Sequence, residues 1–191
     1  MNITKYLKAL GSAAAIAGLQ WAASAAPVSA QVCYDFEDLP VGTSYEVGDV
    51  VTTPDTTTTL NQFQWSNGLW TDEGVATVVP SNNALGSGSQ ELNLNNINMR
   101  VFGHVPPGEV RFRYADLGGN VNFGVNGDFV NVGNLSALDG TVQGGCLIEV
   151  VWLSGPGGES GRVRVSPLNV QAAAVVAVGG QEFYVDDFCH Q

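Results

Sequence analysis

The sequence predicts an all-β protein, built as a two-sheet antiparallel β-sandwich of the jelly-roll kind with adjacent terminal strands. Its 24 glycines, abundant Asn, Thr and Val, and only 13% charged residues are typical of short strands joined by tight turns. Many short segments alternate apolar and polar residues, and no segment after residue 30 carries the apolar stripe of a helix. So many short strands in one chain fit two packed sheets.

The first thirty residues are interpreted as a secretory signal peptide. Lys5 and Lys8 precede an alanine-rich apolar stretch, and Val28-Ser29-Ala30 supplies the small residues that signal peptidase requires. A transmembrane anchor is the alternative, but alanine partitions weakly into lipid. We therefore expect residues 1–30 to be removed, residues 31–191 to form a single β-sandwich domain, and the protein to be secreted or periplasmic.

The composition is strongly acidic, which limits the partners to expect. The chain has 18 acidic residues against seven basic ones, and both of its lysines lie in the predicted signal. Such a surface repels phosphate backbones and anionic lipid headgroups. We expect no nucleic-acid binding and no membrane insertion, whereas metal cations, neutral glycans and cationic surfaces remain possible partners. Alternatively, the charge only keeps the protein soluble.

A hairpin between Asn120 and Val132 is the clearest predicted element. Apolar residues alternate with polar or small ones on both sides of Asn126-Gly127, a type I′ turn signal. Pairing Val125 with Asp128 across this turn makes one face of the hairpin almost wholly apolar, so the register is well determined.

The same alternation runs through Glu109–Tyr114, where Val110, Phe112 and Tyr114 are expected to face the core. Ala172–Val178 is interpreted as a buried strand, because its valines and the glycines that follow disfavour a helix. Further strands are expected at Val32–Glu37, Val50–Thr53, Gln62–Trp65, Val75–Val79, Glu91–Leu94, Ile97–Phe102, Leu147–Trp152, Arg162–Val165 and Glu182–Phe188. Surface loops are expected at Pro80–Gly88, Pro106–Gly108, Leu117–Asn120 and Ser154–Gly161.

Three cysteines suggest one disulfide and one free thiol. Cys33 and Cys189 lie at opposite ends of the mature chain, each in a strand-like acidic segment, and disulfides persist in exported proteins. We predict that these two pair and that Cys146, among apolar neighbours, is a buried free thiol. A three-cysteine metal site is a poor alternative, because the spacings match no zinc pattern.

Carboxylates gather beside both of these cysteines. Asp35, Glu37 and Asp38 follow Cys33, while Asp186 and Asp187 precede Cys189. If the disulfide joins the ends, these acids repel one another unless a cation is present. Carboxylate and carbonyl oxygens are the ligands that Ca²⁺ prefers. The alternative is that they are solvent-facing acids on two edge strands.

The two chain ends also carry a family resemblance. Phe36-Glu37, the turn Leu39–Thr43 and the strand Tyr184–Asp187 resemble those of secreted bacterial carbohydrate-binding, lectin-like jelly-roll domains. The resemblance covers these ends alone. It implies that the terminal strands are neighbours and hold a structural calcium ion, with Glu37 and Asp187 as the ligands to carry over.

A pair of tryptophans suggests where a glycan would bind. Trp65 and Trp70 flank a Ser-Asn-Gly turn, and an exposed aromatic ring can stack on the C–H face of a sugar. We predict that Trp70 is exposed and contacts ligand, that Asn67 and Asp72 hydrogen-bond hydroxyls, and that Trp65 is buried. The alternative is that the aromatic residues here belong to the core.

No convincing catalytic constellation is present. Gly86–Ser89 lacks the spacing of a nucleophile elbow, and Asp35 with Glu37 only approximates the paired acids of jelly-roll glycosidases. The leading hypothesis is therefore a secreted, non-enzymatic domain that binds a glycan or polysaccharide and carries structural calcium. A self-associating surface or extracellular matrix protein is the alternative, and a glycan-active enzyme is the third.

Overall fold

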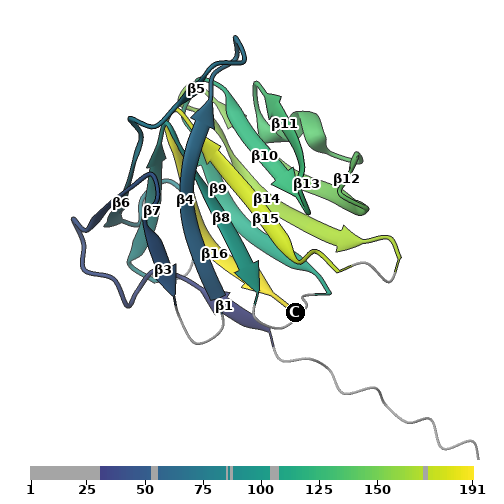
Figure 1. Ribbon diagram of the computed structural model, residues 1–191, viewed down its shortest axis with the longest axis horizontal. Coiled ribbons are helices and arrows are strands. Elements are labelled where there is room, and N and C mark those ends of the chain that lie inside the picture. Colours follow the sequence, from purple (N-terminus) through teal and green to yellow (C-terminus); the bar gives the residue numbers. More distant parts are fainter. Residues whose placement is uncertain (1–30, 53–55, 85, 87, 104–107, 170–171) are drawn as a thin grey trace, which may run out of the picture.

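The computed structural model describes residues 31–52, 56–84, 86, 88–103, 108–169 and 172–191. The described chain folds into two antiparallel sheets packed face to face, which confirms the predicted β-sandwich (Figure 1). The predicted signal, residues 1–30, lies outside the described residues. Within the described part, no helix is long and apolar enough to cross a membrane.

The larger sheet has nine strands in the order β12-β13-β14-β9-β16-β7-β6-β2, with β1 also paired to β16. Its strands are β12 (Val142–Gln143), β13 (Cys146–Gly155), β14 (Gly158–Pro167), β9 (Val110–Asp116), β16 (Phe183–His190), β7 (Gln90–Asn95), β6 (Val75–Pro80), β2 (Ser44–Glu46) and β1 (Val32–Tyr34). The C-terminal strand is thus central in its sheet, with partners on both sides.

The smaller sheet has seven strands in the order β11-β10-β15-β8-β4-β3, with β5 also paired to β4. Its strands are β11 (Asp128–Val132), β10 (Val121–Val125), β15 (Val175–Gly180), β8 (Ile97–Gly103), β4 (Thr56–Gln64), β3 (Val50–Thr52) and β5 (Trp70–Thr71). This sheet is in front in Figure 1.

The core lies between the two sheets, where alternate residues of each strand meet. Phe112 stacks on Phe188 with ring centroids 5.3 Å apart, and Tyr114 stacks on Phe183 at 5.8 Å. Val110, Phe112 and Tyr114 are all buried, as their alternation predicted. Aromatic pairs of this kind contribute about 1 kcal/mol each beyond the area that they bury.

The predicted hairpin is confirmed with its register. Val125 lies opposite Asp128, and Val121 lies opposite Val132. Asn126 and Gly127 both have positive φ, at 52° and 91°, as a type I′ turn requires.

Several segments differ from the sequence-based expectation. The predicted loop Ser154–Gly161 is mostly strand, because β13 and β14 continue to a tight turn between Gly155 and Gly158. Gly161 suits this pairing, since a side chain there would overlap the Val151 carbonyl. The threonine run that begins at Thr56 opens β4, where β-branched residues are favoured. A short 3₁₀ helix, Leu135–Leu138, was not anticipated, and it buries both of its leucines.

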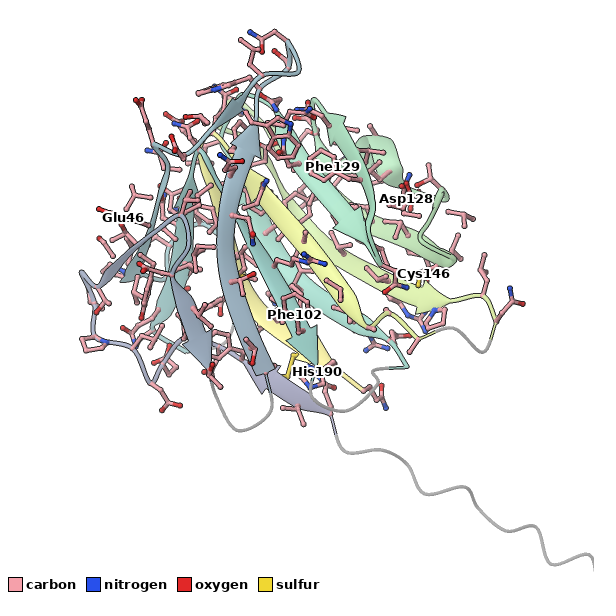
Figure 2. All side chains as sticks on the ribbon, viewed as in Figure 1. Glu46, Phe102, Asp128, Phe129, Cys146 and His190 are labelled. Atoms are coloured by element: carbon pink, nitrogen blue, oxygen red, sulfur yellow. A yellow bond between two sulfur atoms is a disulfide. The ribbon has the colours of Figure 1, made fainter. Side chains whose placement is uncertain are left out.

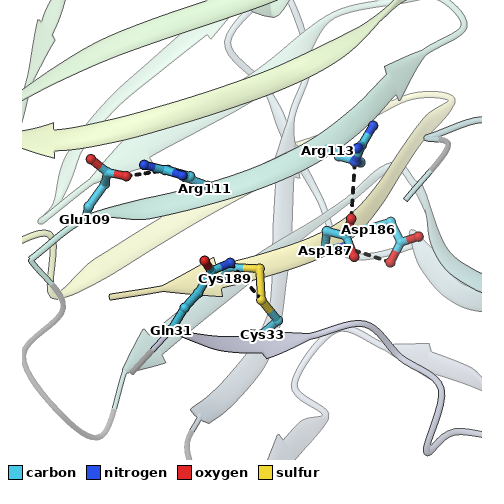
Figure 3. The surroundings of a disulfide bond; sticks show 8 residues. All are labelled: Gln31, Cys33, Glu109, Arg111, Arg113, Asp186, Asp187 and Cys189. Atoms are coloured by element: carbon cyan, nitrogen blue, oxygen red, sulfur yellow. Dashed lines mark hydrogen bonds and ion pairs between the residues drawn. A yellow bond between two sulfur atoms is a disulfide. The ribbon is translucent and has the colours of Figure 1, made fainter. Parts of the chain in front are cut away.

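The two chain ends lie side by side, as predicted. Strand β1 pairs with β16 so that Cys33 is directly opposite Cys189, and the two form a disulfide (Figure 3). Cys146 is free and buried in the core. Both cysteine predictions are therefore confirmed.

Candidate functional site

An open groove of about 520 Å³ crosses the smaller sheet. Val176 and Val178 of β15 belong to the core, so Ala177 between them faces away from it. Ala177 lines the groove together with outward-facing residues of the neighbouring strands. The groove therefore lies on the outer face of this sheet.

Strand register gives the groove a floor between two larger side chains. Phe129 pairs with Gly124, Gly124 with Ala177, and Ala177 with Arg100, so these four residues form one row across four strands. The two middle residues are small, which leaves space above the sheet. Phe129 and Arg100 are three strands apart, roughly 14 Å at the usual spacing of strands.

Two aromatic rings form the wall at one end of this row. Trp70 of β5 packs against Phe129 of β11, with ring centroids 5.4 Å apart and an angle of 35° between the planes. The Trp70 side chain is still 49% exposed. Figure 2 labels Phe129 on the side of the smaller sheet formed by the β10–β11 hairpin. The exposed ring surface is of the kind on which a sugar can stack.

A second row, rich in asparagine, holds the segment that carries Trp70. Asn131 lies opposite Asn122 on the neighbouring strand. The side-chain amides of both residues, and that of Asn120, donate hydrogen bonds to the Gln64 carbonyl. Asn122 also accepts the Gln64 N–H at 2.8 Å. Because Gln64 pairs with Trp70, these bonds place the tryptophan over the groove.

The charged side chains that line the groove are Arg100 and Asp128. Arg100 is exposed, and its guanidinium carbon lies 4.8 Å from the centre of the Phe102 ring. Asp128 begins β11, beside Phe129, and accepts the Gly144 N–H at 3.1 Å. The groove therefore has a cationic donor at one end of the row and an anionic acceptor at the other.

Of the predicted ligand contacts, Trp70 lines the groove, whereas Asn67 and Asp72 are not among its lining residues. Asn67 uses its side-chain oxygen to accept the Leu69 N–H at 3.0 Å, which stabilises its own turn. Asp72 is exposed. The prediction that Trp65 is buried is met only in part, since its ring is half-buried against Phe63.

The predicted calcium ligands have other partners in this structure. Glu37 accepts hydrogen bonds from the Ser89 N–H, the Gln90 N–H and the Ser89 hydroxyl, at 2.7, 2.8 and 2.9 Å. These bonds lower its pKa, with the Ser89 N–H as the largest cause. The Asp187 carboxylate accepts a bond from the Arg113 side chain at 3.2 Å (Figure 3). Glu37 thus has little capacity left for a metal.

A neighbouring carboxyl group does have an unused oxygen. Asp186 is 0% exposed, its Oδ1 accepts the Asp187 N–H at 2.7 Å, and its Oδ2 is buried without a hydrogen-bond partner. Burial is the main cause that raises its pKa to about 7, and the charges of Asp187, Glu91 and Asp35 act in the same direction. Such an oxygen requires a proton or a cation nearby.

Glu91 lies beside Asp186 but is fully satisfied. It lies next to Leu92, which pairs with Val185 of β16, and is 0% exposed. Its carboxylate accepts the N–H groups of Asn82, Asn83 and Ala84 and the side-chain amide of Asn83, at 2.7 to 3.2 Å. Glu91 therefore holds the segment after β6 in place through the hydrogen bonds that its carboxylate accepts.

These carboxyl groups do not complete a metal centre by themselves. Within the described part of the chain, no three His, Cys, Asp or Glu side chains are arranged to hold a metal ion. The unused Asp186 oxygen fits a cation better than Glu37 does, because the Glu37 oxygens are already occupied. Calcium at the joined chain ends, with Glu37 and Asp187 as its predicted ligands, stays a prediction, and Asp186 is a further candidate donor.

No known family model and no curated protein sequence matches the chain. The class of protein is therefore defined here by the fold and the groove alone: a disulfide-linked β-sandwich with an aromatic-walled groove on the outer face of one sheet.

Proposed function

We propose that the protein is a non-enzymatic carbohydrate-binding domain that acts outside the cytoplasm, and that a glycan or polysaccharide chain lies in the groove. The observation that carries this proposal is the exposed Trp70 ring packed on Phe129 above a floor of small residues. An aromatic platform beside polar side chains suits the alternating C–H and hydroxyl surfaces of a sugar.

The polar groups around the floor support the same ligand class. Asn61 and Gln62 line the groove on the β4 side, and both are at least partly exposed. Amides supply a donor and an acceptor together, as a sugar hydroxyl does. The open shape suits a chain that lies across the strands and extends beyond both ends of the groove.

Replacing Trp70 tests this proposal. A glycan array first identifies a ligand of the exported protein, and calorimetry then compares wild type with Trp70→Ala. We expect the variant to lose about 30-fold or more in affinity, as for an aromatic residue at the centre of a binding surface. Its melting temperature should change little, because half of the ring is exposed.

Trp152→Ala is the matched control, since Trp152 is 41% exposed on β13 of the other sheet. This variant should bind as wild type does. If Trp70→Ala binds the glycan as tightly as wild type does, the groove is not the binding site. A large loss of stability in Trp70→Ala would instead identify Trp70 as a packing residue.

A structural calcium ion at the joined chain ends is the second part of the proposal. Asp186 and Asp187 are its candidate donors, with Glu37 close to the same chain end, and the ion would neutralise carboxylates that repel one another. Asp187 lies at a bulge of β16 and has a φ of 48°. In this local conformation, the Asp187 side chain does not follow the regular alternation of side chains between the two faces of the strand.

Calcium should therefore raise the melting temperature of the exported protein. An ion at a hundred times its dissociation constant adds about 2.7 kcal/mol to the free energy of unfolding. Magnesium should add less, because it requires a tighter octahedral shell. Asp187→Asn should reduce the calcium effect, whereas Asp38→Asn, at an exposed acid of the same region, should not. If calorimetry detects no calcium uptake and a chelator leaves the melting temperature unchanged, the site does not exist.

Self-association is the second candidate function, and one feature of β13 favours it. Val151 and Leu153 are 75% and 79% exposed, and β12 pairs with β13 only at Cys146 and Leu147. An apolar strand edge of this kind can pair with another chain. Sedimentation over a range of concentrations distinguishes this function from glycan binding by a monomer.

A further inference from the structure

We propose that the groove selects acidic glycans, and that Arg100 binds the carboxylate of a uronic acid residue. This inference rests on the proposed function and names its substrate class. It starts from the placement of Arg100, a lone positive charge on the smaller sheet of an acidic protein.

The distribution of arginine sets Arg100 apart. The chain has five arginines, and the other four lie on β9 and β14 of the larger sheet: Arg111, Arg113, Arg162 and Arg164. Three of these form ion pairs with Glu109, Glu149 or Asp187. Arg100 forms none of the ion pairs found among the described residues, and it lies in the groove. Its position is therefore not explained by a carboxylate of the protein.

The surroundings of Arg100 hold it in place without neutralising it. The guanidinium lies over the Phe102 ring, two residues along the same strand. A cation–π contact restricts the side chain but leaves the N–H donors at the guanidinium edge available. The planar fork of these donors matches the two oxygens of a carboxylate. Arg100 thus offers a preoriented site for a planar anion.

The second charge in the groove lies away from this site. Asp128 is on β11, three strands from Arg100 on β8, which corresponds to roughly 14 Å across the sheet. At that distance its repulsion of a carboxylate at Arg100 is largely screened at physiological ionic strength. The aromatic wall is at the same end as Asp128. A glycan can therefore stack one residue on Trp70 while a uronic acid further along the chain reaches Arg100.

Matched ligands separate this inference from the proposed function. Oligogalacturonate and its methyl ester share one sugar backbone, and only the acid carries charge. Binding of both to the exported protein is measured by calorimetry at several salt concentrations. We expect the acid to bind about 10- to 100-fold more tightly than the ester, because a hydrogen bond between charged groups usually increases affinity by about this factor. This preference should decrease as salt rises.

Arg100→Gln should abolish the preference, so that the acid and the ester bind this variant with equal affinity. Arg162→Gln is the control, because Arg162 is also exposed and forms no ion pair with the described residues, but lies on the other sheet. It should leave both affinities unchanged.

Three other outcomes would overturn the inference. If the acid and the ester bind equally well and Trp70→Ala binds neither, the proposed function stands but the groove does not select acidic glycans. If the protein prefers only sulfated glycans and Arg100→Gln loses this preference, Arg100 binds a sulfate ester and not a carboxylate. Failure of every neutral and acidic glycan to bind removes the proposed function and this inference with it.

Discussion

Removing the terminal disulfide should cost the protein more stability than other changes at its chain ends. The bond joins residues 156 positions apart, and closing a loop of that length stabilises the folded state by roughly 5 kcal/mol in the chain-entropy model. We expect Cys33→Ala with Cys189→Ala to lower the free energy of unfolding by about that amount in urea titrations. The same loss should follow reduction of the wild-type protein.

Cys146→Ala is the control for this experiment. Cys146 is buried and free, so its loss removes one sulfur from the core and leaves the disulfide intact. Its effect should be about 1 kcal/mol. A reducing agent that leaves the urea midpoint of the wild type unchanged would contradict the prediction. Recovery of a bridge to Cys146 in unreduced peptide maps would contradict the pairing.

Glu91→Ala should produce the second large effect. The Glu91 carboxylate accepts four donors from Asn82, Asn83 and Ala84 while it is fully buried. A buried donor left without a partner costs about 1 to 3 kcal/mol. Because Asn82 is exposed and water can reach its N–H, we expect a total loss of about 3 to 4 kcal/mol in the free energy of unfolding.

Glu91→Gln separates the hydrogen bonds from the charge. Both variants remove the negative charge beside Asp186, but the glutamine retains one acceptor oxygen, so its loss should be smaller than that of Glu91→Ala. Glu182→Ala is the control at an exposed acid and should change stability by less than about 0.5 kcal/mol. Equal stability of Glu91→Ala and Glu182→Ala would show that these hydrogen bonds contribute nothing.

Local patterns predicted much of the fold, because they depend on neighbouring residues. The hairpin around Asn126-Gly127 and the buried face of β9 follow from alternation and turn chemistry alone. The loop predicted at Ser154–Gly161 was wrong because the turn is confined to Pro156 and Gly157, and most of the glycines and serines around it take part in close strand pairing. Composition does not distinguish these two uses of glycine.

The sequence predicted only part of the groove, because local patterns depend on neighbouring residues. Trp70 was predicted as an exposed contact, and it lines the groove. Phe129 and Arg100 were not singled out, although their alternation marks them as outward-facing. Asn67 was chosen for its place in the turn, and the structure shows its side chain bonded within that turn. Local spacing does not reveal which outward-facing residues of distant strands meet.

The sequence by itself determined the sheet class, the apolar face of each clear strand and the pairing of Cys33 with Cys189, since alternation and matched terminal segments are properties of the chain. Tertiary structure alone decided that β11, β10, β15 and β8 lie side by side in this order. That order places Phe129, Gly124, Ala177 and Arg100 in one row. The period of a strand selects the face of each residue, whereas packing between sheets selects its neighbours.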